Sequence, residues 1–400
     1  MGDLRQLRKS SGAALCLECG KCSSMCPLAA FGDFSAARTM SMHDPASEIH
    51  GYAEAVERCL TCGSCEVRCP QGVRYTDYVK GLRADLPVEC RRPRPHGEVF
   101  QGVARLAGMG EKPMRPAWLE DDMEIAEEGE VALFVGCLPI FDVVFREEFQ
   151  VETLASARAA VRFLNHLGIA PVIVPEECCC GHDLLWGGER NAFETVAVQN
   201  INRFRDRGIQ HIVTVCAECC RTWRLDYPEV AADYNPRVQH ITEFLATRLE
   251  SGELMFERSG NGSVTYQDPC RLGRQLGVLE EPRRLLEAIP ETDLVEMDRS
   301  GRDSLCCGTA GFVHCDAVSR QLQVRRLQSA VDTGASKLLT SCPKCLLHFH
   351  CAQSEDRQRS RPAIGIEVQD ITVYLAGLLI GAPESPQGEE REAAQTGERS

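Results

Sequence analysis

The stretch Glu177-Cys178-Cys179-Cys180-Gly181-His182 carries three adjacent cysteines, and a second Cys-Cys-Gly motif follows at Cys306-Cys307-Gly308. Each motif is preceded by a lone cysteine and followed by a Cys-x-x-Cys pair. We call these groups the first cysteine set (Cys137, Cys179, Cys180, Cys216 and Cys219) and the second cysteine set (Cys270, Cys306, Cys307, Cys342 and Cys345). Matching cysteines are offset by 126 to 133 residues, which indicates an internal duplication of one ligand cage.

Short apolar runs lead into the cysteines of both sets. The runs that predict strands cover residues 131–136, 171–174, 211–215, 263–266, 293–297 and 337–340. Helical patterns alternate with them over residues 151–167, 191–207, 282–289 and 316–331. Such alternation is typical of parallel sheets, whose ligands collect on loops beyond the strand ends. We therefore expect two duplicated α/β domains, over residues 131–260 and 261–382.

A different cysteine pattern fills the N-terminal part, where Cys16-x-x-Cys19-x-x-Cys22-x-x-x-Cys26-Pro27 recurs as Cys59-x-x-Cys62-x-x-Cys65-x-x-x-Cys69-Pro70. In bacterial two-cluster ferredoxins with this spacing, the fourth cysteine of each run ligates the other cluster. We call the predicted groups the first ferredoxin set (Cys16, Cys19, Cys22 and Cys69) and the second ferredoxin set (Cys59, Cys62, Cys65 and Cys26). Each is predicted to hold a cubane [4Fe–4S] cluster. Two zinc knuckles are the alternative, which eight cysteines with two Cys-Pro endings disfavour.

The remaining segments complete an α+β multidomain architecture. Residues 1–86 are predicted to form a mostly helical two-cluster ferredoxin-like domain with a helical insert over residues 46–58. Residues 87–130, rich in proline and acidic residues, are predicted to be a surface linker, either a docking segment or a solvated connector. The tail over residues 383–400 has little to bury and is predicted to be disordered.

Composition narrows the classes of function. The 400-residue chain has 23 cysteines and a formal net charge of −14, which argues against a nucleic-acid partner. No signal peptide is recognisable, and the longest late apolar run, about 12 residues, is too short to span a bilayer. We expect a cytoplasmic protein with metal-bound thiolates. Association with the inner face of the membrane, where it occurs, is expected to go through a partner.

Five thiolates in each of the two sets exceed what one cubane cluster or one zinc ion requires. The residues leave two interpretations open. The fifth cysteine is a bystander, or one thiolate bridges iron atoms in an unusual cluster.

The whole pattern, over roughly residues 10 to 375, resembles the D subunit of heterodisulfide reductase, in effect a fusion of that enzyme's C and B subunits. The resemblance implies one noncubane [4Fe–4S] cluster in each cysteine set, with the pair facing each other across a site that cleaves a disulfide. Departures include the extra Cys178, whose ligand role stays open. We interpret Cys220 and Cys315 as small buried hydrophobic residues and Cys90 as a non-ligand.

Three residues near the motifs are candidate catalytic groups. His182 and His314 are proton-donor candidates for a leaving thiolate, with ordinary packed histidines as the alternative. Lys344, inside the last Cys-x-x-Cys, is a candidate for holding an anionic cluster or substrate.

The predicted function is an oxidoreductase subunit that passes electrons from the ferredoxin clusters to the paired site, which reduces a disulfide or related thiol substrate. The alternative is an electron-transfer subunit of a flavoprotein dehydrogenase or benzoyl-CoA reductase type of complex, without substrate chemistry of its own. Redox partner subunits of flavoprotein or membrane cytochrome type are expected. No Gly-x-Gly-x-x-Gly follows a strand, so a flavin belongs to another subunit. The completeness of both cysteine sets favours a working site.

Overall fold

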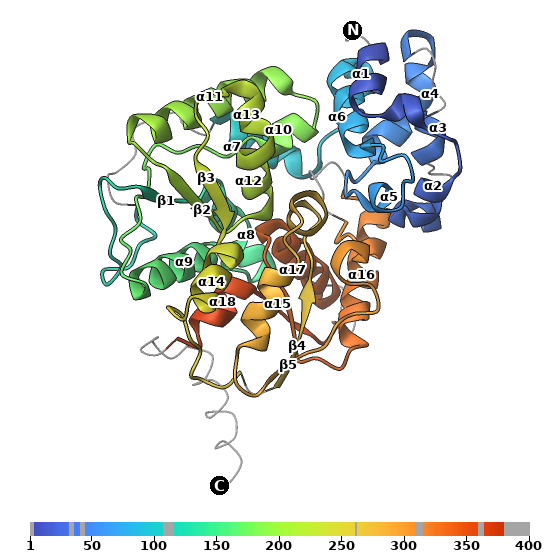
Figure 1. Cartoon of the computed structure of the whole chain (residues 1–400). Coiled ribbons are helices and arrows are strands. Elements are labelled where there is room, and N and C mark those ends of the chain that lie inside the picture. Colours follow the sequence, from blue (N-terminus) through green and yellow to red (C-terminus); the bar gives the residue numbers. More distant parts are fainter. Residues whose placement is uncertain are drawn as a thin grey trace.

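The computed structural model describes residues 4–31, 36–40, 45–106, 116–260, 262–308, 315–358 and 364–379. It combines a helical N-terminal part with two α/β units built on parallel sheets, which confirms the predicted α+β multidomain class. In Figure 1 the N-terminal helices lie to one side of the molecule, where η2 (Pro27–Phe31) contacts α16 (Ala317–Val331) of the second unit. The exact domain boundaries stay a prediction.

The two ferredoxin sets lie on helices and, mostly, on the loops between them. The helices are α1 (Leu4–Ser10), η1 (Ala13–Leu15), α2 (Lys21–Met25), η2, α3 (Ala36–Met40), α4 (Pro45–Arg58), α5 (Ser64–Val67) and α6 (Tyr75–Asp85). The helix α4 confirms the predicted helical insert. Val56, Tyr78 and Val79, which are fully buried, form the centre of the small core on which these helices pack.

The segment predicted as a surface linker is partly buried. It contains η3 (Val88–Cys90), η4 (Pro95–Glu98) and α7 (Val99–Leu106). Phe100 on α7 is 2% exposed, and its ring stacks on Phe145 and meets Phe141 edge-on. The surface-linker prediction is therefore wrong for α7, because three aromatic rings remove one of its faces from water.

The first α/β unit has a three-stranded parallel sheet in the order β1-β2-β3. Its strands are β1 (Val131–Phe134), β2 (His211–Thr214) and β3 (Arg237–His240). Its helices are α8 (Leu138–Phe149), α9 (Leu154–His166), α10 (His182–Trp186), α11 (Arg190–Asp206), α12 (Ala217–Arg221), η5 (Thr222–Asp226), α13 (Tyr227–Val230) and α14 (Ile241–Glu250). The last three residues of β1 and of β2 are buried, and Cys137 and Cys216 follow shortly after the carboxyl ends of these strands.

The second unit repeats this plan with a parallel sheet in the order β5-β4-β6-β7. Its strands are β4 (Gly262–Gln267), β5 (Thr292–Leu294), β6 (Lys337–Thr340) and β7 (Glu367–Asp370). Its helices are η6 (Arg271–Gln275), α15 (Glu280–Glu287), η7 (Gly301–Asp303), α16, α17 (Pro343–Gln358) and α18 (Ile371–Ala376).

The strand predicted over residues 171–174 is reduced to an isolated bridge. Val172 pairs with Ala132 of β1 and with Ala126, and no longer ladder forms there among the described residues. This bridge occupies the place that β5 takes beside β4 in the second unit. Pro171 explains part of the reduction, because proline cannot donate to a sheet ladder.

The last strand of each unit leads into a capped helix through a repeated sequence. Val238-Gln239-His240-Ile241-Thr242 and Val368-Gln369-Asp370-Ile371-Thr372 differ only at the central residue. That residue is the N-cap in both cases, since His240 and Asp370 accept hydrogen bonds from the amides of Thr242 and Thr372. The two units therefore share their last strand–helix junction as well as their cysteines.

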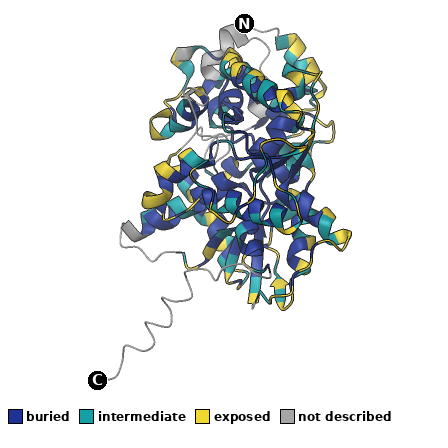
Figure 2. Ribbon diagram, turned by 90° about the vertical axis from the view of Figure 1, so that its left-hand side faces the viewer, coloured by how far each residue is buried: buried dark blue, intermediate teal, exposed yellow. Residues whose placement is uncertain are grey.

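Buried residues concentrate where the sheets meet the helices, and exposed residues form the outer rim (Figure 2). None of the described helices is both long and apolar enough to cross a membrane. The tail predicted to be disordered over residues 383–400 lies outside the described residues.

Candidate redox site

The two ferredoxin loops have the same backbone conformation. Glu18 and Thr61, at matching places in the two motifs, have positive φ angles of 52° and 47°. Their amides point at the preceding cysteine sulfurs, with N to Sγ distances of 3.4 Å to Cys16 and 3.3 Å to Cys59. Such amide contacts stabilise thiolates and cluster sulfur.

The thiols of the ferredoxin sets gather around two small cavities. One cavity is lined by Cys26, Cys59, Cys62 and Cys65. The other is lined by Cys16, Cys19, Cys22 and Cys69, with Cys65 on its wall. The crossing of Cys26 and Cys69 between the two runs is the arrangement expected for two cubane clusters, and the residues fit that cofactor.

The first cysteine set is assembled from three loops beyond the sheet. Cys137 and Cys216 follow β1 and β2 and cap α8 and α12, and Cys219 lies on α12. Cys179 and Cys180 come from the loop before α10. All five side chains are buried, and their thiols make hydrogen-bond contacts in the order Cys137, Cys179, Cys180, Cys219 and Cys216.

The second set has the same construction and lies against the ferredoxin part. Cys270 follows β4, and Cys342 follows β6 at the start of α17. The Sγ atoms of Cys307 and Cys345 are 3.2 Å apart. Cys306 makes a side-chain hydrogen bond with Cys62 of the second ferredoxin set, which is the main reason that the pKa of Cys62 lies below its ordinary value.

The glycine of each Cys-Cys-Gly motif is required by the backbone. Gly181 and Gly308 have φ angles of +78° and +96°, a region that residues with a side chain rarely adopt. A Cβ atom would lie 2.9 Å from Phe193 at Gly181 and 3.0 Å from Leu322 at Gly308. The motif therefore needs glycine at both positions.

A buried group of charges links the two sets. Lys344 Nζ lies 2.6 Å from Asp183 Oδ2 and also forms an ion pair with Glu218. Burial alone would lower the pKa of Lys344, but the two carboxylates hold it well above its ordinary value. Glu218 and Lys344 occupy the same third position in the Cys-x-x-Cys pairs of the two repeats. The repeats therefore meet through an acid and a base at equivalent places.

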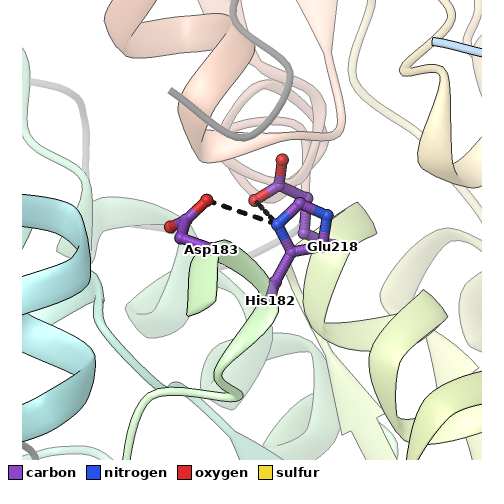
Figure 3. Close-up of side chains that lie close together, drawn as sticks. All are labelled: His182, Asp183 and Glu218. Carbon is purple, nitrogen blue, oxygen red and sulfur yellow. Dashed lines mark hydrogen bonds and ion pairs between the residues drawn. The ribbon is translucent and has the colours of Figure 1, made fainter. Parts of the chain in front are cut away.

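His182 lies between the same carboxylates (Figure 3). Its Nδ1 atom is 3.3 Å from Asp183 Oδ1 and from Glu218 Oε2, and its Nε2 atom accepts a hydrogen bond of 3.0 Å from Arg271 Nε. Burial lowers the pKa of His182 to about 4. At neutral pH the imidazole is therefore uncharged, with the proton on Nδ1.

The three groups His182, Asp183 and Glu218 lie close enough together to bind a metal ion. The ammonium of Lys344 contacts both carboxylates, however, and supplies the positive charge that a cation would bring. The arrangement fits an ion-pair network better than a metal site.

The structure brings together two of the three predicted catalytic candidates, since Lys344 and His182 meet at Asp183 and Glu218. His314 lies outside the described residues. Sequence reasoning missed Asp183, Glu218 and Arg271. Glu218 lies within the first Cys-x-x-Cys pair, Arg271 directly follows Cys270, and Asp183 lies two residues after the first Cys-Cys-Gly motif.

The extra cysteines take different positions. The sulfur of Cys178 faces α11, where Arg203 Nη1 lies 2.6 Å away and Gln199 Oε1 3.5 Å away. Cys220 is fully buried, as predicted. The prediction that Cys315 is buried is wrong, because Cys315 is exposed at the start of the segment that leads into α16.

An open cavity of about 1360 Å³ lies beside the first set. It is lined by residues of α8, α9 and α18 and reaches Gly136 and Glu177, which adjoin Cys137 and Cys178. A Cβ atom at Gly136 would lie 3.6 Å from Cys219 Sγ, so this wall of the cavity is close to the first set.

Family comparisons agree with this geometry. A family model described as a cysteine-rich domain matches residues 131–223 and 264–350, and a 4Fe-4S dicluster domain model matches residues 12–73. The fold and the cysteine sets thus define an iron–sulfur oxidoreductase subunit.

Curated relatives identify the family. The D subunit of the dihydromethanophenazine:CoB–CoM heterodisulfide reductase of Methanosarcina acetivorans is 30% identical over 348 residues, which is 84% of this chain and 80% of the relative. The chain belongs to the family of heterodisulfide reductase D subunits. It is also 30% identical to the EtfAB:quinone oxidoreductase of Syntrophomonas wolfei over 56% of this chain and 31% of that protein. The B subunit of the fumarate reductase (CoM/CoB) of Methanothermobacter marburgensis is 30% identical over 55% of this chain and 41% of that protein.

Proposed function

We propose that this subunit passes electrons singly from two ferredoxin-type [4Fe–4S] clusters to a pair of noncubane clusters that reduce a disulfide or a related thiol substrate. The carrying observation is that two complete cysteine sets lie on either side of one buried charge network. The contact between Cys62 and Cys306 supports entry of electrons through the second set.

The two cysteine sets would hold the noncubane clusters, and the ferredoxin sets would hold the cubane clusters. When bound, the clusters would supply the two electrons and a Lewis acid for the sulfur atoms. The overall step consumes two electrons and two protons, breaks the S–S bond and releases two thiols.

Lys344 would stabilise the negative charge on a thiolate as it forms, because Asp183 and Glu218 keep its ammonium protonated. His182 would orient the network instead of donating a proton, because its Nε2 atom already accepts from Arg271 and its pKa is far below 7. Protons for the released thiols would come from solvent or a partner.

The test uses the anaerobically purified, cluster-loaded chain with coenzyme A, glutathione and other small thiols. A thiol that is a product should perturb the electron paramagnetic resonance (EPR) signal of the oxidised protein. The matching disulfide should be turned over with a reduced viologen as donor. No spectral response and no turnover with any thiol would overturn disulfide reduction as the function.

The second candidate is an electron relay for a partner's chemistry. It is favoured by the burial of the charges between the sets, since His182, Asp183, Glu218 and Lys344 are each at most 4% exposed. Relatives named as EtfAB:quinone oxidoreductase and fumarate reductase subunits point the same way. A relay should leave its spectra unchanged by thiols and should pass electrons to a co-purifying flavoprotein or membrane cytochrome subunit.

A further inference from the structure

Three arginines surround the second cysteine set without a carboxylate partner. Arg271 and Arg326 are almost completely buried, and most of Arg274 is buried as well. Among the described residues, no aspartate or glutamate lies within ion-pair distance of any of the three. The buried Asp268, which pairs with Arg283, acts on Arg274 and Arg326 from beyond ion-pair distance. Buried charges without a partner in contact are strongly unfavourable, so we expect a further source of negative charge nearby.

Arg274 lies closest to the thiols. Its Nε atom donates to the Cys62 carbonyl oxygen at 2.6 Å, and Nη1 donates to the Ser304 carbonyl oxygen at 2.5 Å. Its Nη2 atom is buried and has no acceptor among the described residues. An unused donor beside Cys62, Cys270 and Cys306 indicates an acceptor group among them.

Arg271 and Arg326 approach the second set from two further directions. Arg271 follows Cys270 directly and donates from Nη2 to Thr61 Oγ1 at 2.8 Å, in the loop between Cys59 and Cys62. Arg326 donates to the Arg299 carbonyl oxygen at 2.9 Å and to Ser304 Oγ at 3.0 Å. The Nε atom of Arg271 donates to His182 Nε2, and the other contacts of both guanidinium groups are to uncharged oxygen atoms. None of these partners carries a negative charge.

The first set has a different environment. Its backbone is held by neutral donors, since Asn200 Nδ2 donates to the Cys179 carbonyl oxygen at 3.2 Å and the Tyr227 hydroxyl donates to that of Cys180 at 3.1 Å. The carboxylates of Asp183 and Glu218 lie beside it, and both pair with Lys344, which lies between Cys342 and Cys345 of the second set. The three groups together carry one negative charge, and both carboxylates belong to the first repeat. The two repeats therefore offer equal ligands in unequal electrostatic surroundings.

We propose that the second cysteine set accepts and holds the first electron, because Arg271, Arg274 and Arg326 stabilise added negative charge there. The carboxylates beside the first set oppose the same charge. This inference rests on the proposed function, in which both sets hold clusters, and it assigns them different roles. With reduced viologen as the donor, one electron would pass through clusters held by the ferredoxin sets to a cluster held by the second set, and no bond would form or break.

The test is a potentiometric titration of the cluster-loaded chain followed by EPR. Cys345→Ser and Cys219→Ser first assign the signals of the second and first sets. In the unaltered chain the signal assigned to the second set should show reduction at the higher potential. Arg274→Gln should lower that midpoint, changing the ratio of reduced to oxidised clusters on the order of tenfold at a fixed potential, because a nearby buried charge is lost.

Two further variants test whether the change in midpoint potential comes from the lost charge of Arg274 or from structural damage. Arg274→Lys keeps the positive charge and should restore most of the midpoint, whereas Arg302→Gln removes an exposed arginine of η7 and should leave it unchanged. If Arg274→Gln left the midpoint unchanged, or if Arg274→Lys lowered it equally, the proposal would be overturned. Reduction of the first set before the second would also overturn it. Absence of two assignable signals in the unaltered chain would instead contradict the proposed function.

Discussion

Replacing Lys344 by methionine should destabilise the protein more than any surface substitution. The side chains of Lys344, Asp183 and Glu218 are at most 5% exposed, so solvent screens their charges little. Breaking a buried ion pair by removing one partner costs about 3–5 kcal/mol, because the other charge is left uncompensated. Anaerobic urea unfolding of the cluster-loaded protein, followed by circular dichroism, should show this loss as a lower midpoint.

The exchange of charges provides the control. Because Glu218 and Lys344 occupy equivalent positions in the two Cys-x-x-Cys pairs, Glu218→Lys combined with Lys344→Glu keeps an ion pair at the same interface. The double variant should recover at least half of the stability that Lys344→Glu alone loses. A loss below about 1 kcal/mol for Lys344→Met would refute the reasoning, since the pair would then contribute no more than an exposed one. A double variant as unstable as Lys344→Glu would refute the role of pairing.

Three further outcomes are expected. Anaerobic analysis should find roughly 16 iron atoms and matching sulfide per chain, as four [4Fe–4S] clusters require, whereas zinc or half that iron would contradict it. Cys178→Ser should keep every EPR signal while Cys179→Ser loses one, because Cys178 faces Arg203 and not the first set; the opposite result would reverse the ligand assignment. Burial raises the pKa of Asp370 to about 7, so the folded protein binds a proton that the unfolded chain releases near pH 4, and stability falls as pH rises between these values. Asp370→Asn retains the helix cap and should stabilise the protein by about 1–3 kcal/mol at pH 8 and by less at pH 5.5, as urea unfolding can measure; an equal effect at both pH values would contradict the linkage.

The elements that carry the ligands could be predicted because their sequence signals are local. Apolar runs ending at Cys137, Cys216 and Cys342 correspond to β1, β2 and β6, and cysteine spacing alone paired Cys26 with the second ferredoxin run. Strands β3 and β7 were missed because their apolar pattern is short. Their repeated Val-Gln-x-Ile-Thr sequence was the signal that could have revealed them.

The partners of the candidate site could not be predicted in the same way. Lys344 was singled out by its place between two cysteines, but its contacts with Asp183 and Glu218 arise only where the two repeats approach each other. Arg271 looks like an ordinary residue after Cys270, and only the fold brings it to His182 and Thr61. These contacts join residues that are far apart in the sequence, and the periodicity of apolar residues carries no information about them.

Because the two α/β units are duplicates, only residues that differ between them can give the two cysteine sets different properties. Ten cysteines and two glycines are the same in both repeats. The positive φ angles require the glycines, and the cysteines are the proposed cluster ligands. Positions beside them are free of that constraint, and there the first repeat has Leu138 and Glu218 where the second has Arg271 and Lys344. Two identical environments would give an electron no preferred site, whereas opposite charges at equivalent positions distinguish one set from the other. In a duplicated redox protein, the direction of electron transfer between the two repeats therefore has to come from residues that differ between them.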